Sequence, residues 1–405
     1  MLGIRSQIKV SLGYFLLAAL LGVLLRMFVV LPIPVNYRFI VHTHSHIALL
    51  GWVYIALTTL LYYFYLHGTG QKSRYGKIFW FTQLCLLGML LSFPFQGYAL
   101  FSIIFSSLFL VTSYWFTAFF IKNVPQRTKD SQAYRSIRIA LWFMVGSSIG
   151  PWALGGIMTV LGPESIWYRL AIYFYLHFQY NGWMVMALAG LLIYLLQEMG
   201  IVVSAKRFRY FFRCTGLGIV LSFFLSTLWT VPGPVFYIMG GLGALLQLLG
   251  FGLLFRVCFN NRQLLKSRLS PIQYSSLKLV SVLLVVKMLL QLLTALPYFA
   301  SLSTTILDFT IGYLHWTFLG VVSLGLFFFL DYYKMIKLSK TGLIVYFTGF
   351  VITELLIFYR GTAAWLGWGL IEGYSDVLAV GSLLIPISLM VILWTSKGQE
   401  TKYPF

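Results

Sequence analysis

The chain has 405 residues, of which 60% are hydrophobic and only 9% are charged. A soluble domain carries about 25% charged residues, and its interior is too small to bury this much apolar surface. The composition therefore excludes an ordinary soluble fold. A net charge of +20 would suggest a nucleic-acid partner in a soluble protein. Here the basic residues lie in short loops between apolar runs, which indicates membrane topology and no nucleic-acid partner.

Apolar runs of about 20 residues recur along the whole chain, and each is long enough to cross a bilayer core of ~30 Å. Because backbone groups in lipid must bond to one another, these runs are predicted to be helices. We predict an all-α polytopic membrane protein that forms one transmembrane domain over residues 1–405. Its twelve predicted spans are 8–31, 46–66, 77–97, 99–121, 136–161, 167–198, 210–231, 233–258, 275–298, 306–330, 340–359 and 374–396.

The distribution of basic residues predicts the orientation of these spans, because positive residues favour the cytoplasmic side. When alternate loops are assigned to the cytoplasm, beginning with the N-terminus, the outside loops carry only four basic residues. These are Arg26, Arg38, Arg169 and Arg360. Lys287 falls within the ninth span, and the other 24 of the 29 lysines and arginines fall inside, including Lys397 and Lys402. The sequence therefore predicts a bacterial inner-membrane protein with both termini in the cytoplasm.

Three histidines from distant parts of the chain are predicted to reach a similar depth in the outer half of the membrane. They are His46, His177 and His315. Each follows an outer charged residue by seven or eight positions, and at ~1.5 Å per helical residue this places it roughly 10–12 Å deeper. Ionisable residues within a membrane are costly and indicate a functional site. We therefore predict that these three side chains serve one site.

The segment VHTHSH at 41–46 adds two further histidines beside the first of these. On a helix of about 3.6 residues per turn, His42 and His46 share a face and His44 points away. One face therefore offers two metal ligands, or one ligand and a supporting partner. Imidazole suits haem iron, copper and zinc, and an all-nitrogen set favours haem or copper over structural zinc. The metal-ligand candidates are His42, His44, His46, His177 and His315.

The outer basic residues are all arginine, whose planar group holds carboxylates through paired hydrogen bonds. Haem propionates would reach toward this outer rim, so we predict cofactor-binding roles for Arg38, Arg360 and Arg169. Interfacial anchoring is the alternative explanation. Lys287 and Glu354 are ionisable residues within inner or middle span positions, and they are candidates for a proton path.

This arrangement resembles subunit I of the haem-copper oxidase superfamily, which includes terminal oxidases and nitric oxide reductases. The motifs that carry the resemblance are HIALLGW at His46, YLHFQYNGW at His177, GYLHWTFLG at His315 and YRGTAAW at Arg360. The resemblance implies twelve helices with both termini inside and a haem b between His46 and His315. It also implies a copper ligand at His177 and propionate contacts by Arg360.

Two departures from this family pattern limit the metal content that we expect. The seventh span has no histidine pair for copper, and Thr317 stands where the tenth span would carry a second histidine. We therefore expect one haem, and copper only if His177 recruits His42 or His44. The expected function is electron transfer or the handling of oxygen or nitric oxide, with a quinol or a cytochrome as electron donor.

Two other functions stay open as alternatives. Twelve spans also suit a histidine-dependent transporter of a metal ion or a small solute, although we predict no internal repeat of the kind that many transporters show. The histidines could also act as acid and base in a membrane enzyme without a metal. No nucleophile motif or pair of carboxylates accompanies them.

Overall fold

The computed structural model describes residues 2–396, and all regular secondary structure in this range is helical. Twelve helical stretches of the described range are long and apolar enough to cross a membrane. They are Ile4–Met27, Tyr37–Tyr65, Lys72–Gln96, Leu100–Asn123, Gln132–Val160, Ile166–Glu198, Ala205–Thr230, Pro234–Asn260, Pro271–Leu293, Leu307–Tyr332, Lys340–Leu366 and Tyr374–Thr395. The fold is thus an all-α polytopic membrane protein, as predicted. The predicted inner residues Lys397 and Lys402 lie outside the described range.

Two boundaries differ from the prediction in a way that matters for the site. The second span begins at Tyr37 rather than at residue 46, so the whole VHTHSH segment is helical. Its start is fixed by Asn36, whose side-chain oxygen accepts a hydrogen bond from the Phe39 backbone N–H at 3.3 Å. The eleventh span continues to Leu366, which places Arg360 within a helix instead of in a loop. Hydropathy missed both extensions because polar residues lie in these turns.

The chain divides into two compact units. Unit 1 comprises the chain up to Asn123, Leu326–Ala363 and the residues from Gly367 onward. Unit 2 comprises Val124–Gly325 and Ala364–Leu366.

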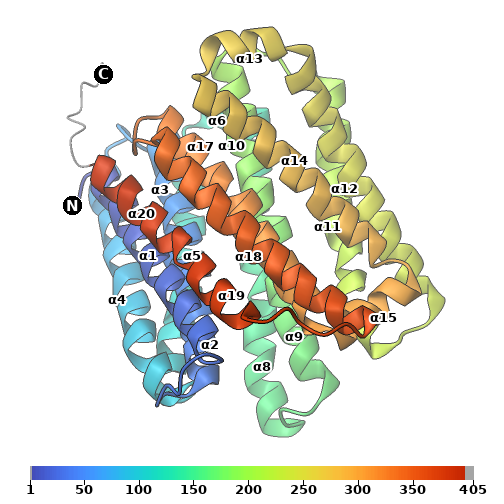
Figure 1. The fold of residues 1–405 in the computed structure, drawn as a ribbon. Helices are drawn as coiled ribbons and strands as arrows, with labels where there is room; N and C mark the ends of the chain where they lie inside the picture. The colour runs from blue at the N-terminus through green and yellow to red at the C-terminus, as the bar shows by residue number, and fades with distance from the viewer. Residues whose placement is uncertain (1, 397–405) are drawn as a thin grey trace. The chain divides into compact units, whose positions relative to one another are not determined.

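Unit 1 contains the first and last helices of the chain, which are blue and red in Figure 1. Its helices are α1 (Ile4–Met27), α2 (Tyr37–His46), η1 (Ile47–Tyr54), α3 (Ile55–Tyr65), α4 (Lys72–Gln96), α5 (Leu100–Asn123), most of α17 (Leu324–Tyr332), α18 (Lys340–Leu366), α19 (Tyr374–Ser382) and α20 (Leu384–Thr395). Helix α1 packs against α2, η1, α19 and α20. Phe15 of α1 stacks on Trp52 of η1 with ring centroids 4.9 Å apart, and both are buried. Aromatic packing therefore fixes η1 against α1.

Unit 2 is built from the helices of the middle of the chain. These are α6 (Gln126–Lys129), α7 (Gln132–Ser147), α8 (Ile149–Val160), α9 (Ile166–His177), η2 (Phe178–Val185), α10 (Met186–Glu198), α11 (Ala205–Ser222), η3 (Phe223–Thr230), α12 (Pro234–Asn260), α13 (Arg262–Arg268), α14 (Pro271–Leu293), α15 (Pro297–Thr305), α16 (Leu307–His315) and η4 (Trp316–Ser323). Helix α7 packs against η2 and α10, α11 packs against α12, and α14 packs against α12 and η4.

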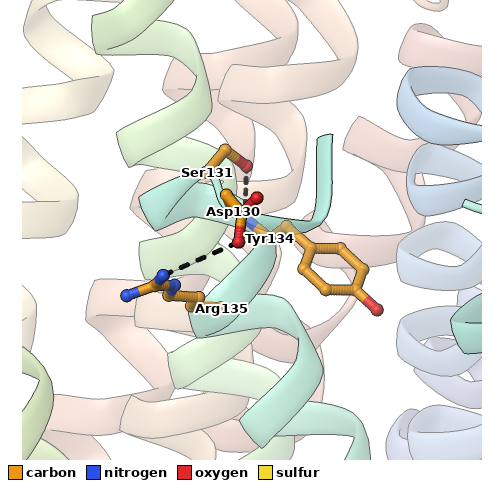
Figure 2. Close-up of polar contacts among 4 residues, drawn as sticks. All are labelled: Asp130, Ser131, Tyr134 and Arg135. Atoms are coloured by element: carbon orange, nitrogen blue, oxygen red, sulfur yellow. Dashed lines mark hydrogen bonds and ion pairs between the residues drawn. The ribbon is translucent and has the colours of Figure 1, made fainter. Parts of the chain in front are cut away.

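The start of α7 shows how a loop between spans passes into a helix (Figure 2). The Ser131 hydroxyl accepts a hydrogen bond from the backbone N–H of Tyr134 at 3.1 Å, which caps the first turn. Arg135 lies 3.8 Å from the Asp130 carboxylate, but the two side chains are 58% and 85% exposed. An ion pair this open to water contributes less than about 1 kcal/mol. The serine cap is therefore the main local signal for the start of this helix.

Candidate functional site

Three of the predicted ligands share one local structure. His46, His177 and His315 are the last residues of α2, α9 and α16, and an eight-residue π-helix follows each of them directly. These π-helices are η1, η2 and η4. Turns of this kind are rare within α-helices and occur often at functional sites. Their recurrence beside three histidines supports a functional role for these three segments.

A sequence spacing accompanies these π-helices, with a glycine five residues after each histidine: Gly51, Gly182 and Gly320. A Cβ atom at Gly51 would lie 2.8 Å from the Cβ atom of Tyr14, and one at Gly182 would lie 2.6 Å from the Cβ atom of Phe143. Two of the glycines thus permit close contact with an aromatic side chain. The His-x4-Gly spacing is a short internal repeat, and sequence reasoning missed it.

His46 belongs to unit 1 and has polar partners at both ring nitrogens. Its Nδ1 atom lies 2.8 Å from the backbone carbonyl oxygen of His42. Because a carbonyl oxygen only accepts hydrogen bonds, Nδ1 carries the proton and Nε2 presents a lone pair. The hydroxyl of Tyr98 donates to Nε2 at 3.2 Å, and the Tyr98 side chain is 45% exposed. The Nε2 atom is therefore in the form that binds a metal ion.

The other two histidines of α2 point in different directions, as the helical spacing predicts. His42 shares the face of His46, and both rings pack against Phe93. His44 points toward α1, where its Nδ1 atom donates to the backbone carbonyl oxygen of Ala18 at 2.8 Å. His44 thus holds α2 against α1, whereas His42 and His46 form one half-buried patch.

Two arginines of unit 1 lie close to each other, and a third lies near His42. Arg26 of α1 and Arg360 of α18 lie close enough for their charges to repel, and Arg26 is also attracted by Glu354. The exposed Arg38 lies near His42. Two neighbouring guanidinium groups can hold carboxylates. Sequence reasoning selected Arg360 and Arg38 but missed Arg26, because the fold of α1 against α18 is what brings it close.

Two other predicted residues have different surroundings. Arg169, in unit 2, places its guanidinium carbon 4.7 Å from the centre of the Trp229 ring, so an aromatic face holds it. Glu354 of α18 is only 2% exposed, and neither carboxyl oxygen has a hydrogen-bond partner among the described residues. The structure thus places Glu354 as a buried carboxyl group near Arg26. Its role in a proton path stays a prediction.

His177 belongs to unit 2 and is only 2% exposed. Its Nε2 atom lies 2.8 Å from the backbone carbonyl oxygen of Ile219 in α11, so this nitrogen carries the proton. Its Nδ1 atom then accepts a hydrogen bond from the Asn181 side-chain amide at 3.3 Å. The protonated nitrogen is the opposite one from that of His46. Metal binding at either nitrogen of His177 would replace one of these two bonds.

A buried lysine lies beside this histidine. Lys287 of α14 is 1% exposed, and its amine donates to the Asn181 side-chain oxygen and, at 2.6 Å, to that of Gln291. The hydroxyl of Tyr313 donates to the same Gln291 oxygen at 3.3 Å. The ring centres of Tyr180 and Tyr313 lie 5.6 and 5.7 Å from the amine. We call these five residues the Lys287 cluster.

His315, the third histidine of the repeat, also belongs to unit 2. The next residue, Trp316, donates from its indole N–H to the backbone carbonyl oxygen of Leu283 at 2.9 Å, which ties η4 to α14. Within residues 2–396, no group of three or more His, Cys, Asp or Glu side chains is arranged to hold a metal ion.

No protein-family model matches this chain, and no curated protein is significantly similar to it.

Proposed function

We propose that this protein is a haem-binding integral membrane protein in which His46 is an axial ligand of one haem b. The observation that carries the proposal is the hydrogen bond from Nδ1 of His46 to the His42 carbonyl oxygen. Histidines that bind metals typically donate their other N–H to a carbonyl or carboxylate, which fixes the ring and raises its basicity. Haem also needs only one or two protein ligands, so a cluster of three is not required.

The neighbours of His46 fit a haem better than a bare metal ion. Phe93 and Tyr98 pack against its ring and offer aromatic surface to a flat macrocycle. Arg38 lies near His42 and would supply positive charge for a propionate, and the family resemblance assigns the same role to Arg360. The family resemblance names His315 as a second ligand. His315 belongs to unit 2, and the spectra of its alanine variant test that assignment.

A bound haem would supply one-electron transfer and, with an open iron position, binding of a diatomic gas. The protein's own contribution is to hold His46 in one tautomer through the His42 carbonyl oxygen. A quinol or a cytochrome is the proposed electron donor. Two histidine ligands would leave no open iron position, which favours electron transfer over the handling of oxygen or nitric oxide.

We also propose a location in a bacterial inner membrane with both termini in the cytoplasm. The excess of basic residues in alternate loops supports this orientation. A fluorescent protein fused to the C-terminus is expected to be fluorescent, and alkaline phosphatase fused at the same place is expected to be inactive. An active phosphatase fusion would reverse the orientation.

The haem proposal is tested by optical spectra of the protein purified in mild detergent after expression with adequate haem supply. We expect the reduced-minus-oxidised difference spectrum to show the absorption bands of haem b. Because one haem is proposed, its amount should be about one per chain. A protein that carries no haem under these conditions would contradict the proposal. If cells that lack this protein also lost the uptake of a metal ion or a small solute, the alternative function as a histidine-dependent transporter would be favoured.

A further inference from the structure

Copper is the metal that the family resemblance implies at His177, and the surroundings of this histidine do not fit it. Copper sites combine several imidazole or sulfur ligands. Here each nitrogen of His177 already has a hydrogen-bond partner: Nε2 bonds to Ile219 and Nδ1 to Asn181. The next group along this chain of hydrogen bonds is the amine of Lys287. When this amine is protonated, its charge opposes the binding of a metal cation beside the imidazole.

A chain of hydrogen bonds with one fixed direction leads to this amine. The Ile219 carbonyl oxygen forces the proton of His177 onto Nε2, which leaves a lone pair on Nδ1. That lone pair accepts from the amide nitrogen of Asn181 and so fixes which way this amide points. The Asn181 oxygen therefore faces Lys287 and accepts a hydrogen bond from it. His177 is thus a positioning residue: it orients the Asn181 side-chain oxygen so that this oxygen can accept a hydrogen bond from an N–H group.

The remaining contacts of the amine are also those of a site for an organic cation. Gln291 turns its side-chain oxygen toward the amine, and Tyr313 donates to that same oxygen, which fixes the Gln291 amide as well. The rings of Tyr180 and Tyr313 face the amine at distances at which an ammonium group is attracted to an aromatic ring. Among the described residues, Lys287 contacts no carboxylate, so amide oxygens and aromatic rings are its recognition groups.

We propose that His177, Asn181, Gln291 and the two tyrosines form a binding site for a primary ammonium group, which Lys287 fills from within the chain in place of a metal ion. The ligand class of this site is a primary amine on an unbranched alkyl chain. The inference stands apart from the haem proposal, because it rests on unit 2 alone and its tests use no haem signal.

The first test is chemical rescue of Lys287→Ala in the purified full-length protein, followed by tryptophan fluorescence during thermal unfolding. The substitution removes the lysine donor from the buried Asn181 oxygen and leaves the Gln291 oxygen with Tyr313 alone, so we expect a lower unfolding temperature. Propylammonium is expected to restore part of this loss, whereas tetramethylammonium, which has no N–H group, is not. The matched control is Lys278→Ala on the same helix, because Lys278 is exposed and lies over the Tyr274 ring.

Three outcomes decide this first test. Rescue of Lys287→Ala that disappears in the double variant Lys287→Ala/Asn181→Leu supports the site and the place of Asn181 in it. An unfolding temperature of Lys287→Ala equal to that of the wild type would overturn the proposal. The proposal would also be overturned if propylammonium raised the unfolding temperature of Lys287→Ala no more than that of Lys278→Ala.

The second test does not depend on whether Lys287→Ala folds. Copper is measured by elemental analysis in the wild-type protein and in His177→Ala, both expressed with added copper. We expect the two proteins to contain the same amount of copper, far below one ion per chain. One copper ion per wild-type chain that is lost in His177→Ala would overturn the proposal, because the histidine would then be a metal ligand.

Discussion

The Nδ1 atom of His46 lies 2.8 Å from the backbone carbonyl oxygen of His42, one helical turn earlier in the same helix. In His177 the other nitrogen, Nε2, lies 2.8 Å from a backbone carbonyl oxygen, that of Ile219. Two histidines that share the His-x4-Gly spacing therefore hold their protons on opposite nitrogens. This difference separates His46, the proposed haem ligand, from His177, which orients the Asn181 amide.

Tyr98→Phe is expected to increase the affinity of the protein for haem. The Tyr98 hydroxyl occupies the lone pair of His46 Nε2 at 3.2 Å, and iron would have to displace it. A typical hydrogen bond contributes about 0.5–1.5 kcal/mol, so the gain should not exceed about tenfold. Titration of the haem-free protein with haem measures it. Tyr210→Phe, at an exposed tyrosine of α11, is the control and should leave the affinity unchanged. Weaker binding by Tyr98→Phe would mean that the hydroxyl helps to hold the haem.

Gly182→Ala is expected to destabilise unit 2. The new Cβ atom would lie 2.6 Å from Cβ of Phe143, and this contact forces η2 away from α7. Overpacking of this kind costs about 1–3 kcal/mol, which thermal or denaturant unfolding can measure. Gly155→Ala in α8 is the matched control, since a Cβ atom there would meet no atom within 4 Å apart from its chain neighbours and the backbone of its own helix. Equal stability of the two variants would show that the close contact has no energetic weight.

Glu354→Leu is expected to stabilise unit 1. It removes two buried carboxyl oxygens that have no hydrogen-bond partner among the described residues. An unsatisfied buried polar group costs about 1–3 kcal/mol, and a leucine of similar size recovers part of this. The exposed Glu198 provides the control, because Glu198→Leu should change stability by less than about 0.5 kcal/mol. A large loss of stability in Glu354→Leu would instead indicate that Arg26 or another group depends on this carboxylate.

The sequence was sufficient for the number of spans but not for the details that define the sites. Hydropathy over windows of about 20 residues reports each apolar run, and it failed at VHTHSH because polar residues lower the hydropathy of the first turns of α2. Helical spacing placed His42 and His46 on one face, because that relation is local. Asn181 and Lys287, by contrast, are 106 residues apart. Their contact depends on how α14 packs in unit 2, which no local pattern encodes.

Arg26 illustrates the same limit in unit 1. The sequence predicts that it is an outer arginine, but its closeness to Arg360 depends on how α1 and α18 are placed in unit 1. The His-x4-Gly spacing was within reach of the sequence, since His46, His177 and His315 each have glycine five residues later. Only the three π-helices show that this spacing marks one recurring local structure.

The most direct test of the haem proposal compares two neighbouring histidines on the same helix. The amount of haem per chain is measured by the pyridine haemochrome method in the wild type, His46→Ala and His44→Ala. His44 binds the Ala18 carbonyl oxygen of α1, so its loss should lower stability but leave the haem in place. We expect haem in the wild type and in His44→Ala, and none in His46→Ala. Haem retained at the wild-type amount in His46→Ala would contradict the assignment of His46 as its ligand.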